Sequence, residues 1–179
     1  PMNEDCWLGQ HGVGSAFSGK QYQDRFVGFT EQLLSKGFVV VLDLHWTNST
    51  GGLAAGQDFF MSSSSPRFWA SVASHPALRN RPGVVFELFN EPHEGSGFTL
   101  TPECFLNGDG CRFAGYNQAV EAIRKTAQAT NLVLFAGKAW NFDLPWLLEN
   151  WPMDPLENCA ASWHPYEFKC RYLSCLNTS

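Results

Sequence analysis

The sequence predicts an α/β fold built on a parallel sheet, and it favours a (β/α)8 barrel among the parallel folds. Short apolar runs alternate with segments of helical spacing along the chain. Near-continuous apolar strands joined by helices are typical of a parallel sheet that is covered on its faces. The 179 residues, of which 44% are hydrophobic, can bury one core, so we expect a single domain over residues 1–179.

Four segments have helical patterns. Residues 20–36 place Phe26, Phe29, Leu33 and Leu34 on one side, and Gly37 is expected to end the helix. Pro66 suits the first turn of a second helix. Further helices are predicted over residues 112–129 and around residues 145–149.

Four apolar runs predict buried strands, over residues 38–44, 83–90, 132–136 and 159–164. They fit an open doubly wound sheet or a closed barrel. The glycine fingerprint of nucleotide-binding doubly wound folds is absent from the sequence. Polar residues instead follow three of the runs, which favours the barrel because barrel enzymes draw site residues from several strand ends.

These polar residues are His45, Asn90 with Glu91, and His164. Glu91 ends an apolar run and precedes Pro92, which cannot continue a strand ladder. A carboxylate there is costly unless it has a function, and a general acid is one such function. By period-two alternation, Glu87 shares the side of Glu91, whereas Asn90 reaches that side only if the strand end twists or bulges.

The charge balance bears on the partners. A net charge of −5 argues against nucleic acid and anionic membranes and fits a neutral ligand. No stretch is long and apolar enough to span a bilayer. The spacing of the loop acids Asp58, Asp109 and Asp143 matches no known metal loop, so we expect no metal and no cofactor.

Six cysteines are present without a Cys-x-x-Cys pair. Cys104 with Cys111, and Cys170 with Cys175, bracket short loops. Two local disulfides are therefore expected, and they would indicate an oxidising, extracellular compartment.

Residues 42–45, 89–92 and 163–166 (Leu-Asp-Leu-His, Phe-Asn-Glu-Pro and Trp-His-Pro-Tyr) resemble strands three, four and six of glycoside hydrolase family 5. Residues 1–3 resemble the end of strand two. The resemblance covers essentially the whole chain. It implies an incomplete TIM barrel, from the end of strand two to the loop after strand six, within a partial catalytic domain.

The resemblance also implies roles for the matching positions. Glu91 would be the general acid/base, and Asn90 would bind the sugar 2-hydroxyl. His45, His164 and Tyr166 would line the cleft at the cleaved sugar, and Tyr166 would also orient the nucleophile.

Three tryptophans are expected on loops after strand ends, where an aromatic face can stack on a sugar ring. They are Trp46, Trp140 and Trp7. Core packing is the alternative for each of them.

The family's nucleophile, a second glutamate at the end of strand seven, has no counterpart in this sequence. None of the remaining glutamates ends a predicted strand; they include Glu94, Glu103, Glu149, Glu157 and Glu167. Because the retaining mechanism needs two carboxylates, the chain alone is expected to be inactive, although its parent is a hydrolase.

We therefore expect a secreted retaining glycosidase, monomeric at full length, that cleaves β-1,4-glucan as an endoglucanase. Its partner would be a β-linked polysaccharide or oligosaccharide. A β-mannanase or another β-glucanase stays open, because loops set substrate choice. A carbohydrate-binding pseudoenzyme is the non-enzymatic alternative, and the retained Asn90 and Glu91 argue against it.

Overall fold

A parallel sheet forms the centre of the computed structural model, which describes residues 1–110 and 112–166. Its five strands follow one another in the sheet in chain order, each parallel to the next. This order fits consecutive strands of a barrel, because in a doubly wound sheet the order of the strands reverses at a switch point. The strands are β1 (Met2–Asn3), β2 (Val40–Trp46), β3 (Val84–Glu87), β4 (Val133–Ala136) and β5 (Cys159–Ser162).

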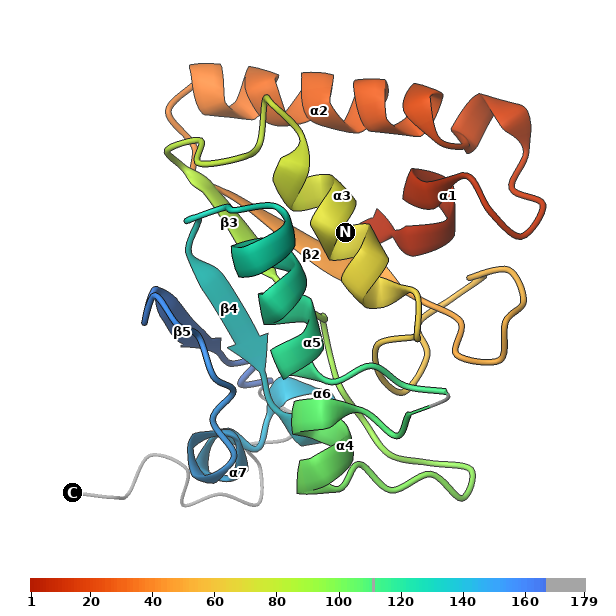
Figure 1. Cartoon of the computed structure of the whole chain (residues 1–179), viewed down its shortest axis with the longest axis vertical. Coiled ribbons are helices and arrows are strands. Elements are labelled where there is room, and N and C mark those ends of the chain that lie inside the picture. The colour runs from red at the N-terminus through yellow and green to blue at the C-terminus, as the bar shows by residue number, and fades with distance from the viewer. Residues whose placement is uncertain (111, 167–179) are drawn as a thin grey trace.

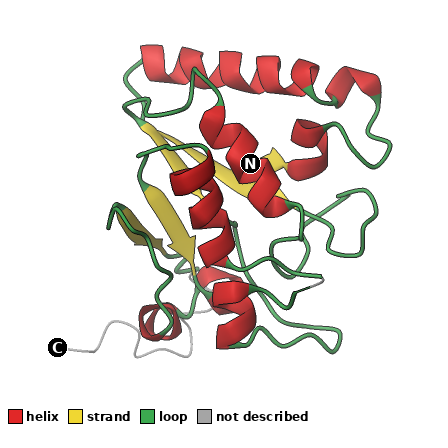
Figure 2. Ribbon diagram, viewed as in Figure 1, coloured by secondary structure: helices red, strands yellow, loops and turns green. Residues whose placement is uncertain are grey.

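Helices connect the strands, and α3 and α5 lie side by side across the sheet (Figures 1 and 2). The four predicted helices are confirmed with shifted ends. The second part of the helix predicted over residues 112–129 is π-helical rather than α-helical. The helical elements are α1 (Glu4–Leu8), η1 (Ser15–Phe17), α2 (Lys20–Ser35), α3 (Ser65–Ser74), α4 (Pro102–Asn107), α5 (Tyr116–Glu121), η2 (Ala122–Thr126), α6 (Lys138–Asn141) and α7 (Leu144–Glu149).

The two faces of β2 have different surroundings. Val40, Leu42 and Leu44 are buried against the helices. On the alternate positions, Val41 is 43% exposed, and Asp43 follows it on the same face. In a closed barrel this second face would be the interior, so the described chain leaves part of a barrel interior open.

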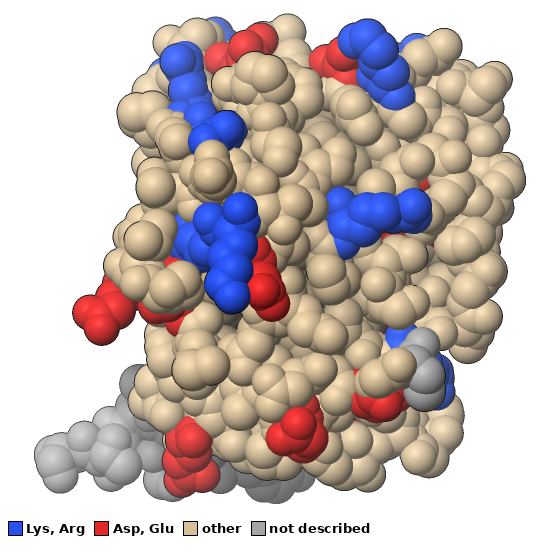
Figure 3. All heavy atoms as spheres, in the orientation of Figure 1, with Lys and Arg blue, Asp and Glu red and all other residues tan. Residues whose placement is uncertain are grey.

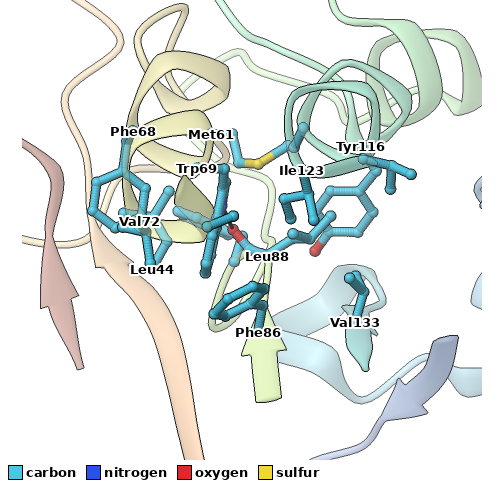
Figure 4. Packing of buried hydrophobic residues seen from close by; sticks show 14 of the residues in the cluster. Leu44, Met61, Phe68, Trp69, Val72, Phe86, Leu88, Tyr116, Ile123 and Val133 are labelled. Atoms are coloured by element: carbon cyan, nitrogen blue, oxygen red, sulfur yellow. Dashed lines mark hydrogen bonds between the residues drawn. The ribbon is translucent and has the colours of Figure 1, made fainter. Parts of the chain in front are cut away.

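The core lies between the sheet and the layer formed by α3 and α5 (Figure 4). Trp69 and Tyr116 are fully buried in it, and the polar atom of each donates to a backbone carbonyl. The Trp69 indole donates to Leu88 O at 3.1 Å, and the Tyr116 hydroxyl donates to Ala136 O at 3.0 Å. These bonds offset the cost of burying the polar atoms, so both rings can pack as core residues.

Two details of the expected packing are wrong. Phe29 of α2, expected on the core side, is 60% exposed, whereas Val27 and Thr30 are buried. Cys104 is a free, buried thiol, so the expected disulfide to Cys111 does not form. The Cys170–Cys175 pair lies outside the described residues.

Charged side chains are scattered over the face shown in Figure 3, with basic and acidic groups often adjacent. Across residues 1–110 and 112–166, no helix combines the length and apolar character that crossing a bilayer requires.

A buried carboxyl group joins α1 to the start of α3. Glu4 is 1% exposed and accepts hydrogen bonds from the hydroxyls of Ser62 at 2.5 Å and Ser65 at 2.8 Å. Burial, with a smaller contribution from the neighbouring Asp5, raises the pKa of Glu4 from 4.5 to about 7. The folded state therefore holds a proton on Glu4 that the unfolded chain releases above pH 4.5.

This proton makes stability fall with rising pH between 4.5 and 7, because the folded state binds more protons there than the unfolded state. Measured by urea unfolding, the free energy of unfolding of the wild type relative to Glu4→Gln is expected to drop by about 3 kcal/mol across that window. The exposed Glu31 on α2 offers a matched control, and Glu31→Gln should leave the profile unchanged. A pH-independent difference between wild type and Glu4→Gln would contradict the assignment.

Candidate active site

Glu91 emerges where the ladder of β3 ends. Regular pairing stops at Glu87, but Leu88 N still donates to Leu134 O at 3.2 Å and Asn90 N to Leu44 O at 3.0 Å. Residues 88–91 thus stay between the neighbouring strands without strand geometry. Side chains therefore do not alternate strictly beyond Glu87. The sequence predicts such a departure if Asn90 and Glu91 are to reach the same side.

Two side chains from the end of β5 meet the Glu91 carboxylate. His164 Nδ1 lies 2.9 Å from Glu91 Oε1, and the Tyr166 hydroxyl donates to the same oxygen at 2.5 Å. The Glu91 side chain is 16% exposed and that of His164 24%, so the pair is largely shielded from water. The hydrogen bond to Glu91 is the main cause that raises the pKa of Tyr166. Three residues predicted for the site are therefore in contact.

A glutamine from the loop after β2 joins Asn90 to Glu91. Gln57 Oε1 accepts from Asn90 Nδ2 at 3.2 Å, and Gln57 Nε2 donates to Glu91 O at 2.8 Å. The amide of Gln57 thus orients both residues. Sequence reasoning missed Gln57 because it lies in a glycine-rich loop without periodicity.

His45 is held by an acid two residues earlier on the same face of β2. Its Nδ1 lies 2.7 Å from Asp43 Oδ2. Asp43 is the register partner of Glu87 on β3. Burial raises the pKa of Glu87, and its Oε1 has no hydrogen-bond partner among the described residues. Beneath Glu91 the sheet therefore carries acids and a histidine rather than an apolar layer.

Trp46 and Trp140 are accessible, as a sugar-stacking role requires. Trp46 is 43% exposed at the end of β2, and Trp140 is 45% exposed. Trp140 stacks on His93, with ring centroids 5.1 Å apart and planes at 10°. A contact with sugar stays a prediction for both tryptophans.

The prediction for Trp7 is wrong. It lies on α1, is 0% exposed, and donates from its indole to Ser71 Oγ on α3 at 3.0 Å. Its ring packs edge-on against Phe68. The residues after β1 form a helix rather than a loop, and this helix packs Trp7 into the core, where no sugar can reach it.

The turn after β4 has an unusual backbone. Ala139, Trp140 and Asn141 have φ angles of 56°, 58° and 59°. A left-handed conformation costs non-glycine residues roughly 1 kcal/mol each. Three in succession persist only where surrounding contacts fix them, and such strain is concentrated at functional sites.

A pocket of about 390 Å³ adjoins the ends of β1 and β2, and His45, Trp46, Asn3, Cys6 and Tyr22 are in its wall. A larger pocket of about 820 Å³ lies between η2 and residues 151–159, and its described lining includes none of the predicted site residues. Volume alone therefore does not locate the site. No group of three or more metal-binding side chains occurs within the described ranges.

Comparison with known proteins identifies relatives across nearly the whole chain. Residues 6–171 match the family model described as cellulase (glycosyl hydrolase family 5). Endoglucanase 1 of Robillarda sp. (strain Y-20) is 25% identical over 190 residues, covering 93% of this chain and 45% of the relative.

Solved structures give the same fold. Endoglucanase Cel5A of Pseudomonas stutzeri superposes with a TM-score of 0.59 at 22% identity, over 97% of this chain and 51% of the other. Cel5A of Thermotoga maritima, solved with cellobiose, gives a TM-score of 0.60 at 17% identity, over 91% of this chain and 47% of the other. The chain spans about half the length of these relatives, and its five parallel strands form part of a (β/α)8 barrel. On the match to residues 6–171, the chain belongs to glycosyl hydrolase family 5, the cellulase family.

Proposed function

We propose that this chain carries the general acid/base of a retaining β-glycosidase of the endo-β-1,4-glucanase type. The observation that carries the proposal is the position of Glu91 just beyond the end of β3, with His164 and Tyr166 on its Oε1 and Asn90 next to it in the sequence. A shielded carboxyl group with two fixed hydrogen-bond partners can hold a proton and take it back at a fixed position.

In this reaction a nucleophilic carboxylate bonds to the anomeric carbon while the glycosidic bond breaks, and the Glu91 carboxylic acid protonates the departing glycosidic oxygen. The resulting Glu91 carboxylate then removes a proton from the water that attacks the anomeric carbon, which breaks the bond to the nucleophile and releases the sugar. Asn90 binds the sugar 2-hydroxyl during both steps. His164 and Tyr166 keep the Glu91 carboxylate oriented.

The nucleophile of a retaining enzyme is a second carboxylate about 5 Å from the acid. Two of the remaining glutamates make local hydrogen bonds: Glu94 accepts from Leu100 N, and Glu103 accepts from Asn107. We propose that the nucleophile belongs to the half of the relatives' length that this chain does not span.

Substrate class and location follow from the same proposal. The Pseudomonas stutzeri structure and the Robillarda relative are named endoglucanases, and the Thermotoga maritima protein was solved with cellobiose, which favours a β-1,4-glucan. The exposed Trp46 and Trp140 offer faces on which sugar rings can stack. A polymer of this kind is too large to enter a cell, so the enzyme would act outside it.

The test compares the 179-residue chain with the longer protein that contains it, on carboxymethyl cellulose and on mannan. The longer protein should release reducing ends from the glucan, and proton NMR of the first product should show the β-anomer. The isolated chain should show no turnover. Turnover by the isolated chain would refute the division of the two carboxylates, and glucan binding without hydrolysis by the longer protein would favour a binding protein.

A further inference from the structure

The segment that carries His164 and Tyr166 is attached to the turn after β4 by one backbone and one side-chain hydrogen bond. His164 N donates to Asn141 O at 2.9 Å, and the Trp163 indole donates to Phe142 O at 3.0 Å. Within the segment, Tyr166 N donates to His164 O at 3.1 Å. These two hydrogen-bond partners of Glu91 thus take their position from residues 141–142.

The same turn is attached to the other side of the site. Trp140 N donates to Pro92 O at 2.9 Å, directly after Glu91. Adjacent residues of one turn therefore hold both the segment of Glu91 and the segment that carries its hydrogen-bond partners. A shift of this turn would change the distance between Glu91 and its partners.

The side chain of Asn141 fixes the turn. It is 1% exposed, and its Oδ1 accepts from Gly137 N at 2.8 Å, which closes the turn on the end of β4. Its φ of 59° lies in the left-handed region, which asparagine adopts more readily than most residues. Its Nδ2 has no hydrogen-bond partner within the described chain, so the acceptor oxygen and the backbone account for the contacts that the residue makes.

We infer that Asn141 is a positioning residue for the acid/base, holding His164 and Tyr166 against Glu91 through the left-handed turn of residues 139–141. The inference rests on the proposed function of Glu91. It assigns Asn141 no contact with substrate. Loss of its side chain should therefore impair proton transfer more than it impairs binding.

Asn80 provides a matched control at the opposite end of the strands. It also has a left-handed φ, of 55°, and its Oδ1 accepts from Thr130 N at 2.7 Å. Asn141→Gly and Asn80→Gly each remove one asparagine oxygen that accepts from a backbone amide, and each keeps a residue that tolerates positive φ. Only Asn141→Gly alters a turn that touches the site.

The activity test uses the longer protein and two aryl β-cellobiosides. Dinitrophenolate leaves without protonation, whereas phenol needs the general acid. Asn141→Gly should lower kcat/KM for the phenyl substrate about tenfold more than for the dinitrophenyl substrate. Asn80→Gly should change both equally. An equal loss on both substrates in Asn141→Gly would overturn the inference, leaving Asn141 a purely structural residue.

A second measurement does not depend on activity. The hydrogen bond to Glu91 raises the pKa of Tyr166, so NMR titration of the ring, assigned with Tyr166→Phe, reports whether the contact is made. The pKa of Tyr166 should fall in Asn141→Gly and stay constant in Asn80→Gly. A constant pKa in Asn141→Gly would overturn the inference.

The two measurements separate the inference from the function on which it rests. A wild type that cleaves neither substrate would refute the proposed function, and the Tyr166 titration would still decide the positioning role. Should Asn141→Gly fail to fold, Asn141→Asp keeps the oxygen acceptor for Gly137. Asn141→Asp should then retain the wild-type ratio of kcat/KM for the phenyl substrate to kcat/KM for the dinitrophenyl substrate. A lower ratio would count against the inference.

Discussion

Replacing Glu91 with glutamine is expected to lower kcat/KM on β-1,4-glucan about a thousandfold in the longer protein that contains this chain, since general acid–base catalysis contributes roughly 10²–10⁴-fold. Glutamine keeps the size of the side chain and an oxygen that can accept from Tyr166. It cannot give a proton to the glycosidic oxygen or take one from water. The loss should therefore appear in the chemical steps rather than in folding or binding.

Substrate choice can isolate the two roles of Glu91. With a dinitrophenyl leaving group the first step needs no acid, so Glu91→Gln should form the glycosyl-enzyme but hydrolyse it slowly. Azide is an anionic nucleophile that needs no base, so it should restore turnover in Glu91→Ala and give a glycosyl azide. The matched control is Glu94→Gln, three residues away and exposed, which should keep wild-type rates. Retention of more than a tenth of the glucan activity by Glu91→Gln would remove Glu91 from the acid/base role.

The strands and the central site residues were predictable because their signals are local. The apolar run at residues 132–136 contains β4, and the run at residues 38–44 overlaps β2. Parallel strands present their carboxyl ends at one edge of a sheet, so polar residues after two different runs were expected to meet. Glu91 and His164, 73 positions apart, do so at 2.9 Å.

The residue positions that could not be predicted from the sequence depend on how loops fold over the strand ends. Gln57 and Asn141 make their contacts through side-chain amides in irregular segments, where no hydrophobic period marks a position. Trp7 was misplaced because the very short β1 leads directly into α1. Phe29 was misplaced because two sides of α2 carry apolar residues, and only tertiary packing selects the buried one.

A buried ion pair anchors β4 and β5 at the ends that lie opposite the site. Arg124 of η2 donates to both carboxylate oxygens of Asp154 at 2.8 Å, and the two side chains are 2% and 0% exposed. The guanidinium also donates to the carbonyls of Ala129, Asn131 and Asn158. Asn131 and Asn158 lie just before β4 and β5, so this one side chain ties together the starts of both strands.

The energetic weight of this pair lies in the cost of separating its partners. Burial alone would raise the pKa of Asp154, but the hydrogen bonds from Arg124 and from two backbone amides outweigh it and lower the pKa. The charged form of Asp154 is therefore stabilised by Arg124. Removing either partner leaves the other buried without its counter-charge, which lowers the free energy of unfolding by roughly 3–5 kcal/mol.

Arg124→Ala is therefore expected to reduce the free energy of unfolding by about 4 kcal/mol in urea titrations at pH 7. The control is the exposed pair of Lys125 on η2 and Glu121 at the end of α5, 3.0 Å apart, where Lys125→Ala should cost about 0.5 kcal/mol or less. The double variant Arg124→Met with Asp154→Leu should recover part of the loss, because it leaves no unpaired charge in the interior. It should not recover all of it, because the three backbone carbonyls that Arg124 bonds would lose their donor. Equal costs for Arg124→Ala and Lys125→Ala would contradict this account, since they would mean that burial adds nothing to the dependence of Asp154 on its partner.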